Sequence, residues 1–90
     1  MKVQLRIDFA RKGSHTTYTL TRITDMEFAP SPELHFVCTP WPDPRKPEFI
    51  SYDCQAKDYY NFFGVTECST DEEAISQVRE FQEAKWRLQE

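Results

Sequence analysis

The sequence predicts an α+β fold, in which an antiparallel β-sheet of four to five strands, built from two hairpins, carries one C-terminal α-helix packed on one face. Three observations predict it. Residues 2–9 alternate polar and apolar side chains, which is typical of a strand with one buried face. Residues 15–24, 34–38 and 49–55 repeat this alternation. Residues 70–89 carry the signals of an amphipathic helix.

The composition favours one compact domain that spans residues 1–90. The chain contains two Trp, four Tyr and seven Phe residues against only two Gly. A disordered chain with the same charge content would lack this apolar mass. Ninety residues are enough to bury a core without a metal ion or disulfide bonds, and they leave no room for a second domain.

The first hairpin is predicted from a turn between two alternating segments. A two-residue loop at Lys12–Gly13 sets Ile7 opposite Tyr18, so that the large side chains of both strands share one face. Ile23 breaks the alternation of the second strand. It marks either a β-bulge or an exposed residue, and the sequence does not separate these alternatives.

A second hairpin is predicted from the third and fourth alternating segments. Their pairing as antiparallel strands sets Phe36 opposite Tyr52. Residues 58–65 are aromatic throughout and have no clean period. They form either a fifth strand or a helical turn that closes the core, and we favour a short strand over residues 60–66.

The helix is predicted over residues 70–89. Thr70 is a good N-cap, and Glu73 three residues later completes a capping box. Carboxylates fill the first turn, where the helix dipole favours negative charge. The apolar residues that recur at helical spacing are Ala74, Ile75, Val78, Phe81 and Leu88. We expect this apolar stripe to pack on the sheet.

The charge balance and the cysteines restrict the environment of the protein. The net charge of −4 argues against a general nucleic-acid coat protein, which is usually basic. No apolar run approaches the length of a membrane span, and residues 1–6 alternate in polarity, unlike a signal peptide. We therefore expect a cytoplasmic protein with no membrane partner. Its three cysteines, an odd number, fit a reducing compartment, and we expect free thiols.

No pattern of residues indicates an enzyme, a metal site or a cofactor. His35 and Cys38 have a spacing that metal sites use, and Cys54 and Cys68 would complete four ligands. On a strand, however, positions 35 and 38 point to opposite faces. Burial as small hydrophobic residues explains Cys38 and Cys54 better. Cys68 lies just before the helix, but the three carboxylates that follow it oppose thiolate formation.

The segment from residue 40 to residue 47 contains four prolines and Trp41, and it resists a purely structural explanation. Two alternatives for Trp41 remain open: an exposed anchor for a partner, or a cap that folds back onto the core. In an antiparallel meander, the first and third connections lie at the same end of the sheet, and this end would be basic. The candidate binding residues are Trp41, Arg45, Lys46, Arg11 and Lys12.

These features favour a small protein-binding module, an inhibitor or adaptor that acts on a larger protein or ribonucleoprotein complex. Small domains of this kind are often encoded by phages or mobile elements as anti-defence proteins, which is a prior for the class and not a property of these residues. The alternative function is nucleic-acid binding through the basic hairpin-tip end, with Trp41 and Tyr59 or Tyr60 as stacking groups.

A third hypothesis, an acidic DNA mimic, places the binding surface on the outer face of the helix. Its candidate residues are Glu72, Glu80 and Glu83. Arg79 and Arg87 both lie four residues from Glu83, where they can form ordinary ion pairs on a helix. A solvated face of mixed charge therefore explains the pattern better than mimicry does.

Overall fold

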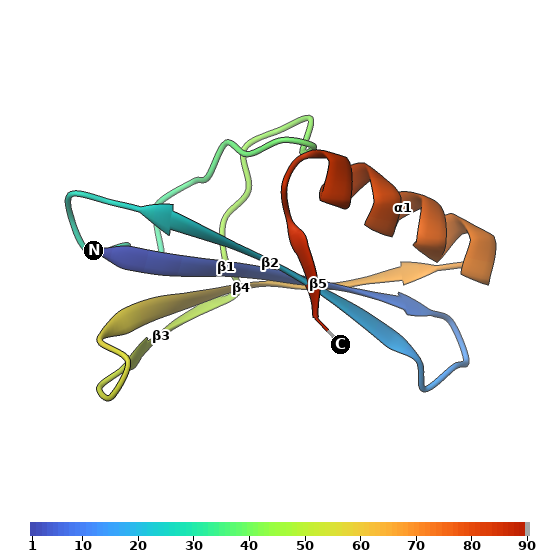
Figure 1. Ribbon diagram of the computed structural model, residues 1–90, viewed down its shortest axis with the longest axis horizontal. Helices are drawn as coiled ribbons and strands as arrows, with labels where there is room; N and C mark the ends of the chain where they lie inside the picture. Colours follow the sequence, from blue (N-terminus) through green and yellow to red (C-terminus); the bar gives the residue numbers. More distant parts are fainter. Residues whose placement is uncertain (90) are drawn as a thin grey trace.

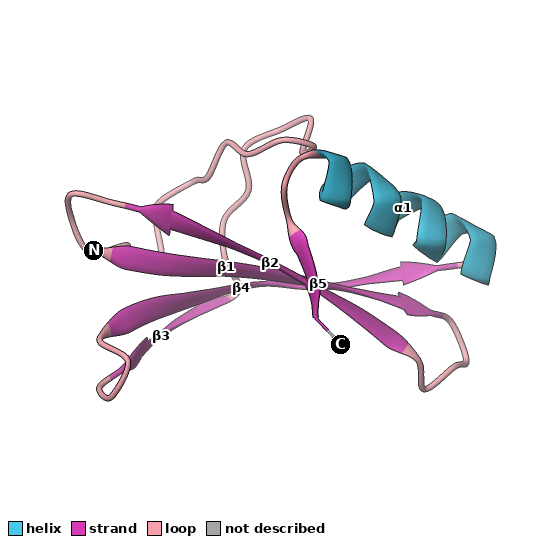
Figure 2. Cartoon of the chain, viewed as in Figure 1, coloured by secondary structure: helices cyan, strands magenta, loops and turns pink. Residues whose placement is uncertain are grey.

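The computed structural model of the protein describes residues 1–89, whose helix and strands are shown in Figure 1 and Figure 2. Their bounds in chain order are β1 (Lys2–Arg11), β2 (Thr17–Asp25), β3 (Phe49–Asp53), β4 (Asp58–Cys68), α1 (Asp71–Glu83) and β5 (Arg87–Gln89). The strands form one five-stranded sheet in the order β3-β4-β1-β2-β5. The predicted α+β class, with a sheet and a C-terminal helix, is therefore confirmed.

The prediction of a purely antiparallel sheet is wrong, because β1 and β4 are parallel. After β2 the chain crosses over the sheet through residues 26–48 and returns as β3 at an edge (Figure 1). β3 and β4 form an antiparallel hairpin, and β4 lies beside β1. A local alternation pattern cannot predict this parallel pair, since it aligns Val3 with Tyr59, far along the chain.

The first hairpin forms where predicted, but in a different register. The turn at Lys12–Gly13 is present, and Gly13 has the positive φ of 80° that favours glycine in such a turn. β2 begins later than expected, so Ile7 pairs with Leu20 and not with Tyr18. Because the register shifts by an even number of residues, each side chain keeps its predicted face.

The predicted second hairpin is wrong. Residues 34–38 form no strand, and an isolated bridge joins Phe36 to Arg45 instead. The following segment forms β3, which pairs with β4 and places Phe49 opposite Phe62. The prolines of the connection explain part of this difference, because they remove backbone donors that a strand ladder needs.

β4 contains the strand expected over residues 60–66 and extends beyond it at both ends. Aromatic side chains occupy both faces of this strand, which explains why its sequence has no clean period. The register against β1 also shifts between Arg6 and Asp8, which marks a β-bulge. Gly64 lies in this irregular stretch with a φ of 100°, a conformation that favours glycine.

The helix begins as predicted. The Thr70 hydroxyl accepts a hydrogen bond from the Glu73 N–H at 3.1 Å. The Glu73 carboxylate accepts one from the Ser69 N–H at 3.0 Å. The first bond satisfies a backbone donor that the first helical turn would leave unpaired. In a standard capping box the N-cap residue donates the second bond, and here Ser69, the residue before it, donates instead.

The helix is shorter than predicted, and its extension to residue 89 is wrong. Lys85 adopts a φ of 70°. Its N–H donates to the Gln82 carbonyl at 3.0 Å, and the Trp86 N–H donates to the Phe81 carbonyl at 3.0 Å. These are the two bonds of a Schellman motif, which ends the helix and turns the chain towards β5.

The core lies on one side of the sheet, beneath α1 and the connection between β2 and β3 (Figure 1). The ring centroids of Phe81 on α1 and Phe9 on β1 are 5.1 Å apart. The Trp86 indole N–H donates to the Thr39 carbonyl at 2.9 Å, which ties the end of the helix to the connection. The strand residues buried here include Val3, Leu5, Ile7, Phe9, Leu20 and Phe63.

Candidate functional site

Trp41 caps the core and is not an exposed anchor. Only 8% of the residue is exposed. Its ring centroid lies 4.7 Å from that of Phe63 and 5.4 Å from that of Trp86. The guanidinium carbon of Arg45 lies 5.6 Å from the centre of the same indole ring, within the range of a cation–π contact. The structure thus decides between the two alternatives that the sequence left open.

The four cations of the predicted basic end are not brought together. The meander that would gather them does not form, and the β1–β2 turn lies well apart from the β2–β3 connection (Figure 1). Arg11 pairs with Asp71 at 3.2 Å, and Lys46 pairs with Glu33 at 3.6 Å. These exposed pairs reduce the positive charge around Arg11 and Lys46. Trp41 and Arg45 do lie together, but Arg11 and Lys12 form no common site with them.

The acidic residues of the helix lie on its outer face. Glu72, Glu80 and Glu83 line a shallow hollow of about 490 Å³. Arg79 and Ile75 line the same hollow. A DNA mimic would need an uninterrupted set of carboxylates there, and this face instead mixes a cation and an apolar side chain among them.

The cysteines occupy three different environments. Cys68 is buried, and burial raises the pKa of its thiol, to which the nearby Glu73 carboxylate adds. Burial also raises the pKa of the half-buried Cys38 thiol, against the opposite effect of Arg22. Cys54 is exposed, so its interpretation as a small hydrophobic residue is wrong. Within residues 1–89, no three His, Cys, Asp or Glu side chains gather as metal ligands would.

The face of the sheet opposite the helix, called the open face here, is the strongest candidate for a binding site. Both α1 and the β2–β3 connection lie on the other side of the sheet (Figure 1). Strand alternation directs Arg6 and Asp8 of β1 to the open face. Three apolar side chains there are largely exposed: Phe49 at 51%, Val65 at 54% and Ile23 at 68%. Ile23 is therefore an exposed residue and does not mark a bulge.

A row of stacked side chains crosses the open face from β3 to β1. The strand pairing aligns Phe49 with Phe62, and Phe62 with Arg6. The two phenylalanine ring centroids are 5.2 Å apart, and the Arg6 guanidinium carbon lies 5.6 Å from the Phe62 centroid. Tyr60 adds a third ring, 6.2 Å from that of Phe49. The row therefore joins aromatic surface to a cation at the centre of the sheet.

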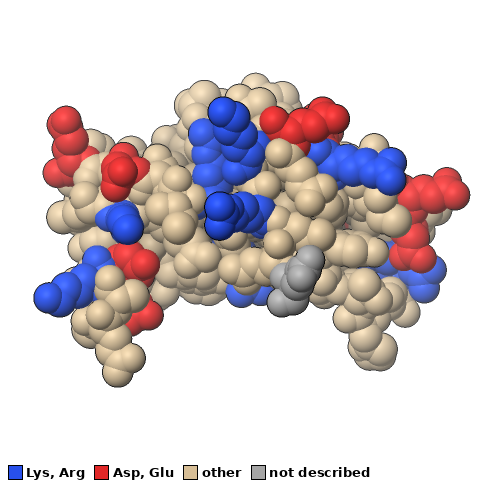
Figure 3. Space-filling model, viewed as in Figure 1, with Lys and Arg blue, Asp and Glu red and all other residues tan. Residues whose placement is uncertain are grey.

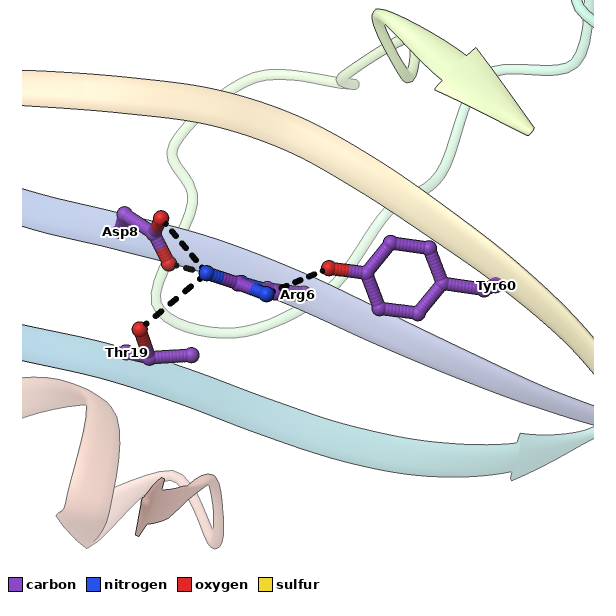
Figure 4. Close-up of polar contacts among 4 residues, drawn as sticks. All are labelled: Arg6, Asp8, Thr19 and Tyr60. Atoms are coloured by element: carbon purple, nitrogen blue, oxygen red, sulfur yellow. Dashed lines mark hydrogen bonds and ion pairs between the residues drawn. The ribbon is translucent and has the colours of Figure 1, made fainter. Parts of the chain in front are cut away.

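Arg6 is held in place by three neighbours (Figure 4). Its Nε and Nη2 donate to the two carboxylate oxygens of Asp8 at 2.9 and 3.0 Å. Its Nη1 donates to the Tyr60 hydroxyl at 2.9 Å, and a longer bond of 3.5 Å joins Nη2 to the Thr19 hydroxyl. The bonds to Asp8 raise the pKa of Arg6 most, against the effect of burial. Arg6 is thus a permanent charge whose side chain is already ordered.

Charge is distributed unevenly across the open face. Asp53, Asp58 and Glu67 lie on β3 and β4, towards one edge of the sheet. Arg87 lies on β5, at the opposite edge, with Asp25 on the neighbouring strand β2. A ligand with one sign of charge along its whole length would be repelled at one edge of this face. The face therefore suits a partner that presents charges of both signs.

One feature of the sequence does indicate this face. Arg6 and Asp8 lie two residues apart in the clearest strand, so their side chains share a face and can form an ion pair. The aromatic side chains could not be assigned in the same way. Their faces depend on the β4 bulge and on the pairing of β3 with β4, and neither follows from local alternation.

No protein-family model, curated protein or solved structure matches this chain. In the part of the chain that the structure describes, no helix is both long and apolar enough to cross a membrane.

Proposed function

We propose that this protein is a small protein-binding module, an inhibitor or adaptor that docks on a larger protein or ribonucleoprotein complex through its open face. The exposure of Phe49 and Val65, on the two strands that present the stacked rings, carries this proposal. Ile23 adds a separate exposed apolar side chain on the same face, on the far side of β1. Apolar surface removed from water in a complex contributes about 25 cal/mol per Å². Contiguous exposed apolar patches on small folded proteins commonly mark interaction sites.

The ordered Arg6 strengthens this proposal. Interface cores are enriched in arginine and aromatic residues, and the open face places Arg6 against Phe62. A long side chain normally loses conformational entropy when a partner orders it. Because Asp8 and Tyr60 already hold Arg6, binding would cost less of this entropy.

The cysteines support action in a reducing compartment such as the cytoplasm. The three thiols form no disulfide with one another, and Cys54 is exposed. An exposed thiol is readily oxidised or cross-linked outside the cell, whereas cytosolic reductants keep it free.

Nucleic-acid binding is the second candidate, and the aromatic rings of the open face favour it. Unpaired bases stack on rings that are presented by a sheet, as Phe49, Phe62 and Tyr60 are here. The surrounding charge is unfavourable, because Asp53 and Asp58 lie on the two strands that carry these rings. We therefore place this function below protein binding.

Affinity purification from the native host tests the proposal, with the wild-type chain and a Phe49→Ala variant as parallel baits. Removal of an aromatic anchor should weaken the binding free energy by about 2 kcal/mol, which should reduce recovery of the partner at least tenfold. Phe28→Ala is the matched control, because Phe28 is 58% exposed but lies in the β2–β3 connection and not on the sheet.

Recovery of the same partner by all three baits would contradict the proposal. If nuclease treatment abolishes capture of the partner, nucleic-acid binding is favoured instead. The log–log dependence of nucleic-acid affinity on salt should then be steep, since each phosphate contact releases a counterion.

A further inference from the structure

A hollow at the β5 edge of the sheet collects three cations. Its volume is about 480 Å³. The lining residues are Thr21, Arg22, Ile23, Lys85 and Arg87, and none of them is acidic. Among residues 1–89, the ion pairs of the structure join other residues. Arg22 makes one long hydrogen bond here, from Nη1 to the Ala84 carbonyl at 3.5 Å.

Two local features of the chain build this hollow. β5 is short, and within residues 1–89 it pairs with residues 19–21 of β2, so the β2 edge at Ile23 has no described strand beside it. The left-handed turn at Lys85 then places the end of the helix near that uncovered edge. Arg87 pairs with Thr21, which puts it on the open face. The hollow is therefore continuous with the proposed docking surface.

The hollow contains more cations than the negative end of the helix alone would stabilise. The C-terminus of a helix has a partial negative charge of about half an elementary unit, which stabilises a nearby cation. The contact of Arg22 with the Ala84 carbonyl uses this effect. Lys85 and Arg87 then add like charges to the same cavity in a protein of net charge −4. A concentration of one sign against the net charge attracts ligands of the opposite sign.

We infer that this hollow binds an acidic segment of the partner protein, with carboxylates against the three cations and an adjoining apolar side chain against Ile23. The inference rests on the proposed function and specifies the chemistry of the partner. The volume falls within the range of about 300–1,000 Å³ that ligand sites occupy. Ile23 supplies the apolar wall through which the hollow meets the rest of the open face.

An acidic peptide fits this surface better than a nucleic acid does. A single strand needs a positive track along several nucleotides. Beyond the hollow, the open face carries Asp53 and Asp58, which would repel a continuing phosphate chain. In the view of Figure 3, one group of blue side chains lies at the centre of the molecule, and other blue side chains lie towards both ends among the red ones. The three cations of the hollow thus lie within a surface of mixed charge, which suits a short acidic segment better than a long polyanion.

An NMR titration of the ¹⁵N-labelled full chain tests the inference without knowledge of the partner. The probe is a blocked octaglutamate peptide at low salt, with an octalysine peptide and an eight-nucleotide oligothymidine as comparators. Octaglutamate should give saturable shifts at the amides of residues 21–23 and 85–87. The Lys85→Gln/Arg87→Gln variant should bind it at least fivefold more weakly. Lys12→Gln/Lys46→Gln, which removes two exposed cations elsewhere, should bind as the wild type does.

Each contrary outcome is distinct. Absence of saturable shifts, or equal binding by the Lys85→Gln/Arg87→Gln variant, overturns the inference. Tighter binding of oligothymidine at the same amides overturns the peptide assignment in favour of a nucleic acid. None of these results depends on Phe49, so the inference can fail while the docking of a partner on the open face survives. The spectrum of each free variant shows whether it is folded.

Discussion

The two faces of the sheet are built from alternate residues of the same strands, yet their exposure is opposite. Val3, Leu5 and Leu20 on the helix side are fully buried, whereas Phe49 and Ile23 on the open face are more than half exposed. A buried side chain can change only with a loss of packing. An exposed one can change freely unless a partner contacts it. Substitutions on the two faces should therefore separate folding from binding.

The largest effect is expected on the helix side. Phe81→Ala should lower the free energy of unfolding by about 3–5 kcal/mol, because it empties the space against Phe9 and Trp86. Ile75→Ala on the same helix is the control. Ile75 is 37% exposed, so its loss should be near 1 kcal/mol or less. Urea denaturation measures both values, and similar losses for the two variants would show that α1 is not docked as described.

The bulge in β4 gives the next largest effect, because it changes which residues face each side. Gly64→Ala should cost about 1–3 kcal/mol, since a φ of 100° strains any residue with a Cβ. An added Cβ would also lie 2.6 Å from a carboxylate oxygen of Glu48, which is flexible and can move. Adding Glu48→Ala should therefore recover little stability. Full recovery in thermal denaturation would show that the contact and not the backbone causes the loss.

A smaller effect is expected from the ion pair at the centre of the open face. A double-mutant cycle with Arg6→Gln and Asp8→Asn should give a coupling free energy of about 1 kcal/mol, because Asp8 is 5% exposed and the contact has two bonds. The exposed pair of Arg11 and Asp71 is the control, with an expected coupling below about 0.5 kcal/mol. Equal couplings would mean that solvent screens the Arg6 pair as well.

The smallest effect on stability is expected at Phe49, where the effects on folding and on binding should differ most. Phe49→Ala should change the free energy of unfolding by less than about 1 kcal/mol, since the side chain is half exposed and contacts mainly Phe62 and Tyr60. The same variant should lose at least tenfold in partner affinity. A stability loss near that of Phe81→Ala would instead assign Phe49 a structural role.

Alternation predicted the faces of the first two strands but not their neighbours. The apolar positions of β1 lie in the core as expected, and the shift that pairs Ile7 with Leu20 leaves every face unchanged. Period-two patterns cannot distinguish registers that differ by two residues. They also contain no information on the parallel pairing of β1 with β4, which depends on packing across the whole domain.

The ends of the helix show the same limit on a smaller scale. Thr70 and Glu73 are a local signal for the start of the helix, and the structure contains the hydrogen bond between them. The end is marked by Lys85 in a left-handed conformation, where a glycine would have been the usual signal. Leu88 happened to fall on the helical stripe, although in the structure it pairs with Leu20 in the sheet. The open face was missed because its rings come from strands whose pairing was not predicted.

The parallel pairing of β1 with β4 also has a consequence for synthesis. When β1 and β2 have left the ribosome, β1 still presents one edge without a neighbour, because residues 58–68 have not yet emerged. An unpaired strand edge recruits other chains. Chains stalled before residue 58 should therefore aggregate, and sedimentation of a 1–57 fragment beside the complete chain measures this. Protection of the β1 edge therefore depends on β4, which emerges later in translation.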